Sequence, residues 1–201
     1  MKTNKKKTAY VCQSCGANFP RWLGRCSSCG EWSSLVEERV ETTAPTTKVA
    51  ADVRAPRLDE VQAESARRYP TGIGELDRAL GGGPVAGGVI LLGGDPGIGK
   101  STLLMQALGA LCRTGHEALY VTGEESAAQV ALRAKRIGGE GIEKVRILAT
   151  NALEEAEAAI EALGVTVAVV DSIQTLRAAE LTSPMGSVGQ LREATSRLIE
   201  I

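Results

Sequence analysis

A glycine-rich segment over residues 93–102, GGDPGIGKST, carries the clearest chemistry in the sequence. It fits the phosphate-loop pattern of a glycine, four further residues and then Gly-Lys-Ser/Thr. In such a loop, small residues let backbone N–H groups surround a polyphosphate, and the N-terminus of the following helix favours the anion. Lys100 is expected to reach the β- and γ-phosphates, and the Ser101 hydroxyl to ligate Mg²⁺. The expected nucleotide contacts are Gly94, Asp95, Pro96, Gly97, Ile98, Gly99, Lys100, Ser101 and Thr102.

The residues on both sides of this loop supply the context that the motif requires. Residues 89–92 form an apolar run typical of a strand, and apolar residues recur at helical spacing over residues 103–111. A glycine-rich turn that matches by chance is the alternative. The strand before the loop and the helix after it favour a nucleotide-phosphate site.

Three acidic residues follow two further apolar segments. Glu124 and Glu125 come after a predicted strand at residues 118–122, and Asp171 ends an apolar strand at residues 165–170. Ligands bind at the carboxyl ends of parallel strands, so Asp171 has the place of a Walker B carboxylate that holds Mg²⁺. Glu124 or Glu125 is expected to deprotonate the attacking water. An acid that only stabilises a helix dipole is the alternative, and Glu125 lies nearer the helix start.

Two C-x-x-C pairs near the N-terminus, Cys12/Cys15 and Cys26/Cys29, are separated by ten residues. Each pair places two thiolates on one tight turn, and the two turns supply four sulfur ligands for a tetrahedral Zn²⁺. Four cysteines leave no open position for water, so the expected zinc is structural. Two disulfides are the alternative. A segment this short buries little core, so metal binding is expected to supply its folding free energy.

The same region has an uneven charge and an unusual aromatic content. Residues 1–30 contain six Lys and Arg residues and no acidic residue, which is typical either of a nucleic-acid contact or of a solvated tail. Trp22 and Trp32 are expected to pack locally around the metal, with a base-stacking platform as the alternative.

Length and composition predict one full domain and a small module. The 201 residues are 43% hydrophobic and 23% charged, as in ordinary globular proteins. No apolar run is long enough to span a membrane and no secretory signal is visible, so a cytoplasmic location is expected. The predicted organisation is a zinc finger with a basic tail at 1–32, a flexible linker at 33–56 and a nucleotide-binding domain at 57–201.

The nucleotide-binding part is predicted to be α/β, with a mostly parallel sheet covered by helices on both faces, because strands alternate with helices. The polar loop at residues 178–189 is either a functional loop or an ordinary connection. The last helical segment has no stop signal, so the sequence is expected to be the N-terminal portion of a longer protein.

Together these motifs resemble the bacterial RadA (Sms) family of RecA-like ATPases, from Tyr10 to the end of the chain. The resemblance is carried by the four-cysteine finger, the phosphate loop and the segments TGIGELD at 71–77, YVTGEES at 120–126 and VVDSIQ at 169–174. It implies a RecA-like P-loop core, incomplete at its C-terminus and preceded by a zinc ribbon or knuckle. Lys100 and Ser101 match Walker A, Asp171 matches Walker B, and Glu124 matches the catalytic glutamate, with Glu125 the adjacent candidate.

The resemblance also implies an activity and partners. It indicates a DNA-dependent ATPase and branch-migration motor of recombinational DNA repair that uses ATP and Mg²⁺ and binds single-stranded or branched DNA. A RecA-type recombinase as partner and a hexameric ring in the full-length protein are implied in the same way, as is a finger that engages DNA or partner proteins. Family members continue into a Lys-Asn-Arg-Phe-Gly motif and a Lon-protease-like domain, and both are absent from these 201 residues. The alternatives are an ATP-gated ring scaffold that recruits recombination proteins and, for these residues alone, an inactive zinc-dependent interaction module.

Overall fold

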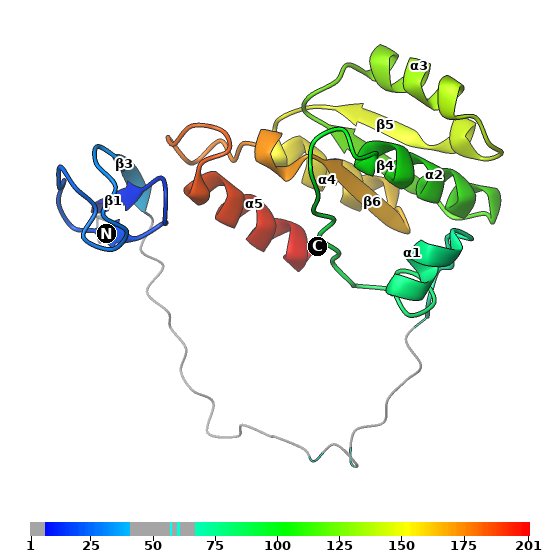
Figure 1. Cartoon of the computed structure of the whole chain (residues 1–201), viewed down its shortest axis with the longest axis horizontal. Helices are drawn as coiled ribbons and strands as arrows, with labels where there is room; N and C mark the ends of the chain where they lie inside the picture. The colour runs from blue at the N-terminus through cyan, green and yellow to red at the C-terminus, as the bar shows by residue number, and fades with distance from the viewer. Residues whose placement is uncertain (1–6, 41–56, 58–59, 61–66) are drawn as a thin grey trace, which may run out of the picture.

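The computed structural model describes residues 7–40, 57, 60 and 67–201. Figure 1 shows a small N-terminal sheet and a larger α/β part. Most of the predicted linker, residues 41–56, lies outside the described residues. None of the helices in these described ranges is long and apolar enough to cross a membrane.

The small sheet consists of β1 (Lys7–Cys12), β2 (Asn18–Phe19) and β3 (Leu35–Val40). The strands are antiparallel in the order β2-β1-β3, with Cys12 opposite Leu35. The sequence placed the start of a linker at residue 33, and this boundary is wrong, because residues 35–40 pair with β1 along its whole length. Leu35 also supplies a buried side chain to the core of the module.

The core of this module excludes both of its tryptophans. It is built from Cys12, Cys26 and Leu35, against which other apolar side chains pack, and the side chains of Trp22 and Trp32 are 57% and 69% exposed. The predicted packing of the indoles around the metal is therefore wrong. The partly buried apolar residues of this core are Tyr10, Cys15, Ala17, Phe19 and Leu23.

The larger part is built on a parallel three-stranded sheet in the order β5-β4-β6. The central strand β4 (Ala118–Thr122) is buried at all five positions, and β5 (Arg146–Ala149) and β6 (Val167–Asp171) flank it. Alternate residues of β4 face opposite sides, so both faces of the sheet need a cover.

Helices cover both faces of this sheet, as predicted (Figure 1). On the Tyr120 face lie α2 (Lys100–Arg113) and α3 (Ala127–Ile137), which contribute Met105, Leu108 and Val130. On the other face α4 (Leu153–Leu163) packs Ala156 against Leu119 and Val121. The remaining elements are α1 (Gly74–Ala79), the 3₁₀ turns η2 (Ile142–Lys144) and η3 (Ile173–Thr175), and α5 (Val188–Glu200).

The strand expected before the phosphate loop does not form. Residues 88–95 have no regular structure, and Val89, Ile90 and Leu91 are 61%, 49% and 88% exposed. Backbone N–H and C=O groups of a strand need a neighbouring strand to form a ladder. Among the described residues, no strand pairs with this segment, and β6 pairs only with β4.

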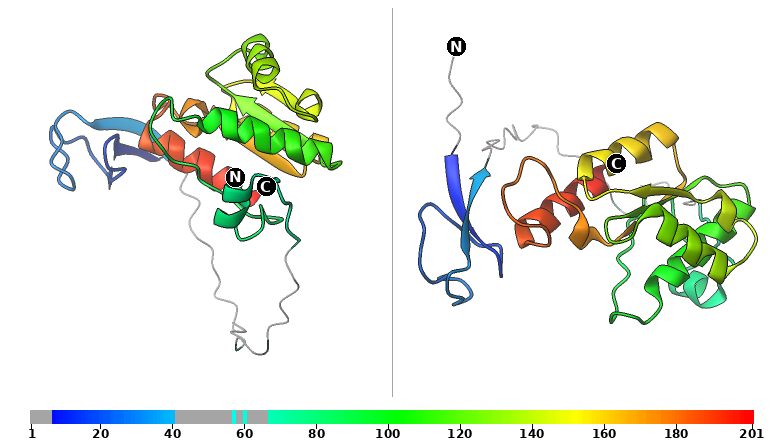
Figure 2. Two further views of the ribbon diagram at one scale, coloured as in Figure 1. Left: turned by 45° about the vertical axis from the view of Figure 1, so that its right-hand side comes forward. Right: turned by 90° about the horizontal axis from the view of Figure 1, so that it is seen from above.

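The small sheet lies beside the N-terminal end of α5 (Figure 2). Arg192 Nη1 donates a hydrogen bond of 3.2 Å to the carbonyl oxygen of Gly16, and Thr182 Oγ1 donates one of 3.2 Å to that of Glu37. These contacts join the cysteine-bearing module to the segment that follows β6.

Candidate functional site

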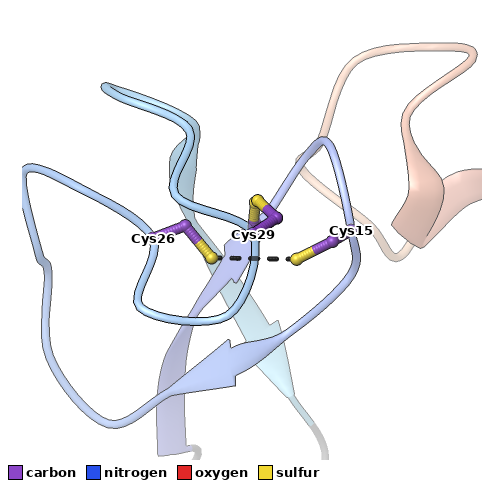
Figure 3. Close-up of side chains that lie close together, drawn as sticks. Cys15, Cys26 and Cys29 are labelled. Atoms are coloured by element: carbon purple, nitrogen blue, oxygen red, sulfur yellow. Dashed lines mark hydrogen bonds between the residues drawn. The ribbon is translucent and has the colours of Figure 1, made fainter.

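The four cysteines of the N-terminal module converge on one point. Their Sγ atoms all lie within 4.8 Å of one another, with Cys12 to Cys29 at 3.6 Å and Cys15 to Cys26 at 3.7 Å. Figure 3 shows the second of these pairs across the space between the two turns. A disulfide needs about 2.05 Å between sulfurs, and all the cysteines are free thiols. Zinc–sulfur bonds of about 2.3 Å in a tetrahedron place sulfurs about 3.8 Å apart, so the cysteines are positioned for a metal site.

Two similar turns bring these sulfurs together. The N–H of Gly16 donates to the carbonyl of Cys12, and the N–H of Gly30 donates to that of Cys26, each at 2.8 Å. Gly16 and Gly30 have φ values of +71° and +80°, a left-handed conformation that favours glycine. The C-x-x-C-G spacing thus dictates the geometry of each turn.

The pKa values of these thiols differ because their surroundings differ. Burial acts to raise the pKa of Cys12, but the Ser34 hydroxyl at 3.2 Å and nearby backbone amides lower it to about 6. The amide of Cys29 lowers the pKa of Cys26. The amide of Glu31 acts to lower the pKa of Cys29, but burial and the neighbouring sulfurs raise it to about 12. The surroundings of Cys12 and Cys26 thus favour the thiolate, whereas those of Cys29 disfavour it. A bound divalent cation would offset the repulsion between neighbouring thiolates.

The phosphate loop wraps around the amino group of its own lysine. Lys100 Nζ donates to the carbonyl oxygens of Gly94 and Asp95 at 2.7 and 2.9 Å. Gly99 caps α2 with φ +103°, and Gly97 has φ +79°. No atom lies within 4 Å of the position that a Cβ on either glycine would occupy, so the inner backbone of the loop stays accessible. Helix α2 begins at Lys100, which directs its N-terminal amides to the loop.

The carboxyl ends of β4 and β6 bring Asp171 and Glu125 into one network. Tyr120, fully buried in β4, donates its hydroxyl to Asp171 Oδ2, and Arg133 of α3 donates to the Tyr120 hydroxyl at 2.8 Å. Arg133 also forms an ion pair of 3.4 Å with Glu125. Burial and the Asp171 carboxylate raise the pKa of Tyr120, so its hydroxyl remains a donor.

Glu124 has a different partner at the same strand ends. Ser172, which follows Asp171, donates its hydroxyl to Glu124 Oε1 at 2.9 Å. The turn after β4 is organised by Thr122, whose hydroxyl accepts the N–H groups of Glu124 and Glu125 at 3.3 and 3.2 Å. A Cβ on Gly123 would lie 2.4 Å from Thr175 Oγ1, so only glycine lets the two strand ends approach this closely.

The structure brings some of the predicted site residues together and leaves others apart. Asp171, Glu124 and Glu125 share one edge of the sheet, and Thr102 at the start of α2 lines the same hollow as Arg133. Among the described residues, no hydrogen bond or ion pair joins residues 94–102 to that edge. Tyr120 and Arg133 were not predicted as site residues. Tyr120 begins the segment at 120–126 but has no role of its own in that pattern, and an arginine on a helix face carries no motif.

Comparisons with known families match both parts of the chain. A family of rubredoxin metal binding domains matches residues 10–37, and the KaiC ATPase family matches residues 69–145. The chain is therefore a zinc ribbon followed by a KaiC-like, RecA-type ATPase domain with a parallel sheet.

Individual relatives narrow this class. The DNA repair protein RadA of Bacillus subtilis is 41% identical over 98% of the chain, that of Rickettsia bellii 44% over 97%, and that of Aquifex aeolicus 45% over 98%. Over nearly its whole length the chain matches the N-terminal portion of these RadA proteins, and it spans about 44% of their length.

Proposed function

We propose that this chain is the N-terminal portion of a DNA-dependent ATPase that drives branch migration in recombinational DNA repair, in the cytoplasm. The observation that supports it most directly is the convergence of Glu124, Ser172 and Asp171 at the carboxyl ends of β4 and β6. An acid that can hold Mg²⁺ and an acid that can accept a proton from water then lie at the ends of two neighbouring strands, in a chain with a complete phosphate-loop motif.

In this proposal the phosphate loop and the strand ends have separate tasks. Lys100 and the N-terminal amides of α2 bind the phosphates, exchanging the carbonyl contacts of Lys100 for phosphate oxygens. The Ser101 hydroxyl and the Asp171 carboxylate are oxygen ligands of the kind that Mg²⁺ prefers. Bound Mg²⁺ would neutralise charge on the phosphates during transfer. The Tyr120 hydroxyl orients the Asp171 carboxylate.

The two glutamates receive different roles in the proposal. Glu124, oriented by Ser172, is the general base that accepts a proton from the attacking water. Glu125 forms an ion pair with Arg133 and links the strand end to α3. The four cysteines Cys12, Cys15, Cys26 and Cys29 hold a structural zinc.

The partners proposed for the longer protein are single-stranded or branched DNA, a RecA-type recombinase and further copies of the chain in a ring, in keeping with the relatives' description as DNA repair proteins.

One observation favours a second candidate function for these 201 residues alone. The apolar segment 89–91 next to the phosphate loop is exposed, whereas a complete ATPase core would be expected to cover it. It supports an interaction module with an inactive ATPase core.

The test uses Lys100→Ala in a protein extended to the length of the relatives. Loss of the phosphate-binding amine is expected to lower DNA-stimulated ATP turnover at least about 100-fold, since a positioned donor is worth about that much in the transition state. Lys135→Ala, which removes an exposed lysine of α3, is the matched control and should leave turnover unchanged. Unchanged turnover in Lys100→Ala would contradict the proposed ATPase. Turnover by the 201-residue chain itself would exclude the inactive module.

A further inference from the structure

The zinc module carries two exposed indoles that its own fold does not need. Trp22 and Trp32 are 57% and 69% exposed, although the core of the module holds smaller aromatic and aliphatic side chains. A single exposed apolar residue is ordinary, but two large aromatic side chains exposed on the same part of a surface are typical of an interaction site. The exposure is therefore a property to explain.

The two indoles both lie close to Gly24. A Cβ placed on Gly24 would stand 3.6 Å from the Trp22 ring and 3.9 Å from the Trp32 ring. The rings are thus neighbours on one part of the surface, and a larger residue at position 24 would contact both of them. Two neighbouring exposed indoles offer flat apolar surfaces that suit planar ligands.

A cation is held against this pair. The Arg25 guanidinium lies 5.8 Å from the centre of the Trp32 ring, and its Nε donates to the carbonyl of Gly30 at 2.8 Å. Arg25 and the neighbouring Arg21 remain exposed. The hydrogen bond orients the guanidinium while leaving its other N–H groups available for an anion.

We propose that Trp22, Trp32 and Arg25 form a base-stacking platform for single-stranded nucleic acid. The proposal deepens the DNA-dependent function above by assigning a contact surface on the zinc module. Aromatic side chains that stack on bases, together with cations that follow the phosphates, are the usual means of binding single strands without sequence preference. The charge favours nucleic acid over a protein surface, since residues 1–30 contain six cationic side chains and no carboxylate, and Glu31 is the nearest acid in the sequence.

The chain offers a direct optical test, because Trp22 and Trp32 are its only tryptophans. The zinc-loaded 201-residue chain is titrated at low salt with an oligothymidine strand, in the absence of nucleotide. Stacking is expected to quench tryptophan fluorescence in a saturable manner. Absence of quenching and of binding would overturn the proposal, as would quenching by an acidic protein but by no oligonucleotide.

Substitutions separate stacking from a general loss of structure. Trp22→Ala or Trp32→Ala is expected to weaken binding of a fluorescein-labelled oligothymidine about 5- to 150-fold, the range for one stacked base. Trp22→Phe and Trp32→Phe retain a ring and should stay within a few-fold of the parent. Leu132→Ala, which truncates another exposed apolar side chain, is the matched control. Zinc content is measured for each variant, and weakened binding in the alanine variants counts only with zinc retained. Full-strength binding by both zinc-loaded alanine variants would overturn the platform.

The contribution of Arg25 is tested by the salt dependence of oligonucleotide affinity. Arg25→Gln is expected to reduce the slope of log affinity against log salt by about 0.7, as for one phosphate contact on a single strand. Arg78→Gln removes an exposed arginine of α1, outside the zinc module, and should leave the slope unchanged. Lys100→Ala should also bind the oligonucleotide normally. Failure of the ATPase proposal and failure of the platform would therefore be distinguishable.

Discussion

The zinc module and the ATPase part build their sites in opposite ways. All four sulfurs come from residues 12–29, on two turns with the same internal hydrogen bond. The residues of the candidate nucleotide site come from the loop at 94–102, the end of β4 and the end of β6, which together span residues 94–171 of the chain. The first site depends on local sequence and a metal, and the second depends on the order of strands in a sheet.

The two parts should respond differently to substitution. In the zinc module, the metal holds together a core too small to be stable by burial alone. In the ATPase part, the core around β4 is stable by packing, and the site is a consequence of that packing. Substitutions should therefore act on the fold in one part and on chemistry in the other.

The largest expected effect is that of Cys26→Ser on the zinc module. Loss of one of four thiolates should abolish stoichiometric zinc binding and unfold residues 7–40, because structural zinc contributes about 10–16 kcal/mol in such modules. The α/β part should keep its helices. Zinc content and circular dichroism measure the two effects. Cys112→Ser, at the buried fifth cysteine on α2, is the control and should keep one zinc. One equivalent of zinc in Cys26→Ser would contradict ligation by four cysteines.

The next effect concerns chemistry without loss of structure. Glu124→Gln in the extended protein should lower kcat for ATP hydrolysis about 10²- to 10⁴-fold, the usual contribution of a general base, while nucleotide binding persists. Glu125→Gln is the matched variant and should change kcat less than tenfold, since it loses only a half-exposed ion pair with Arg133. Rapid-quench hydrolysis assays distinguish the two. The opposite order of effects would exchange the roles of the glutamates.

The smallest expected effect tests packing near the loop that follows β6. Gln190 of α5 is 1% exposed, accepts the N–H of Ala178 at 2.8 Å and donates to the carbonyl of Ser183 at 3.1 Å. Gln190→Leu leaves these buried groups without partners and should lower the free energy of unfolding by about 1–3 kcal/mol in urea titrations. Gln106→Leu, at an exposed position of α2, should stay within about 0.5 kcal/mol of the parent. Equal stability of both variants would show that the loop is not held by Gln190.

Local patterns predicted much of this molecule. The turns at Cys12 and Cys26, the start of α2 at Lys100 and the strand that ends at Asp171 follow from spacing and apolar periodicity. The start of α4 is less evident from the sequence, because Thr150 and Asn151 both precede it, yet the N-cap is Ala152, whose N–H donates to Thr150 Oγ1. Neighbouring polar residues compete for one cap, and only the folded backbone selects among them.

The remaining features depend on contacts between distant segments. The sequence favoured Glu124 over Glu125 only by resemblance and by the distance from the helix start, whereas the structure gives each glutamate its own partner, Ser172 for Glu124 and Arg133 for Glu125. The apolar run at residues 89–92 has the composition of a strand, but a strand also needs a neighbour. Trp22 and Trp32 are large apolar residues of the kind expected in a core, but other side chains already fill the core of the zinc module. The local sequence pattern predicts which secondary structure a segment favours, but contacts with distant segments decide whether that structure forms.

The hydrogen bond from Arg192 to Gly16 would let a metal ion at the cysteine site sense movement of α5. Gly16 directly follows the sulfur ligand candidate Cys15, and Arg192 lies in the first turns of α5, after the loop that Gln190 holds. A displacement of α5 therefore shifts backbone next to the cysteine cluster. The visible spectrum of a cobalt ion depends on the geometry of its ligands. If Co²⁺ replaced zinc at this site, its visible absorption spectrum would therefore report displacement of α5, which follows β6 in the chain.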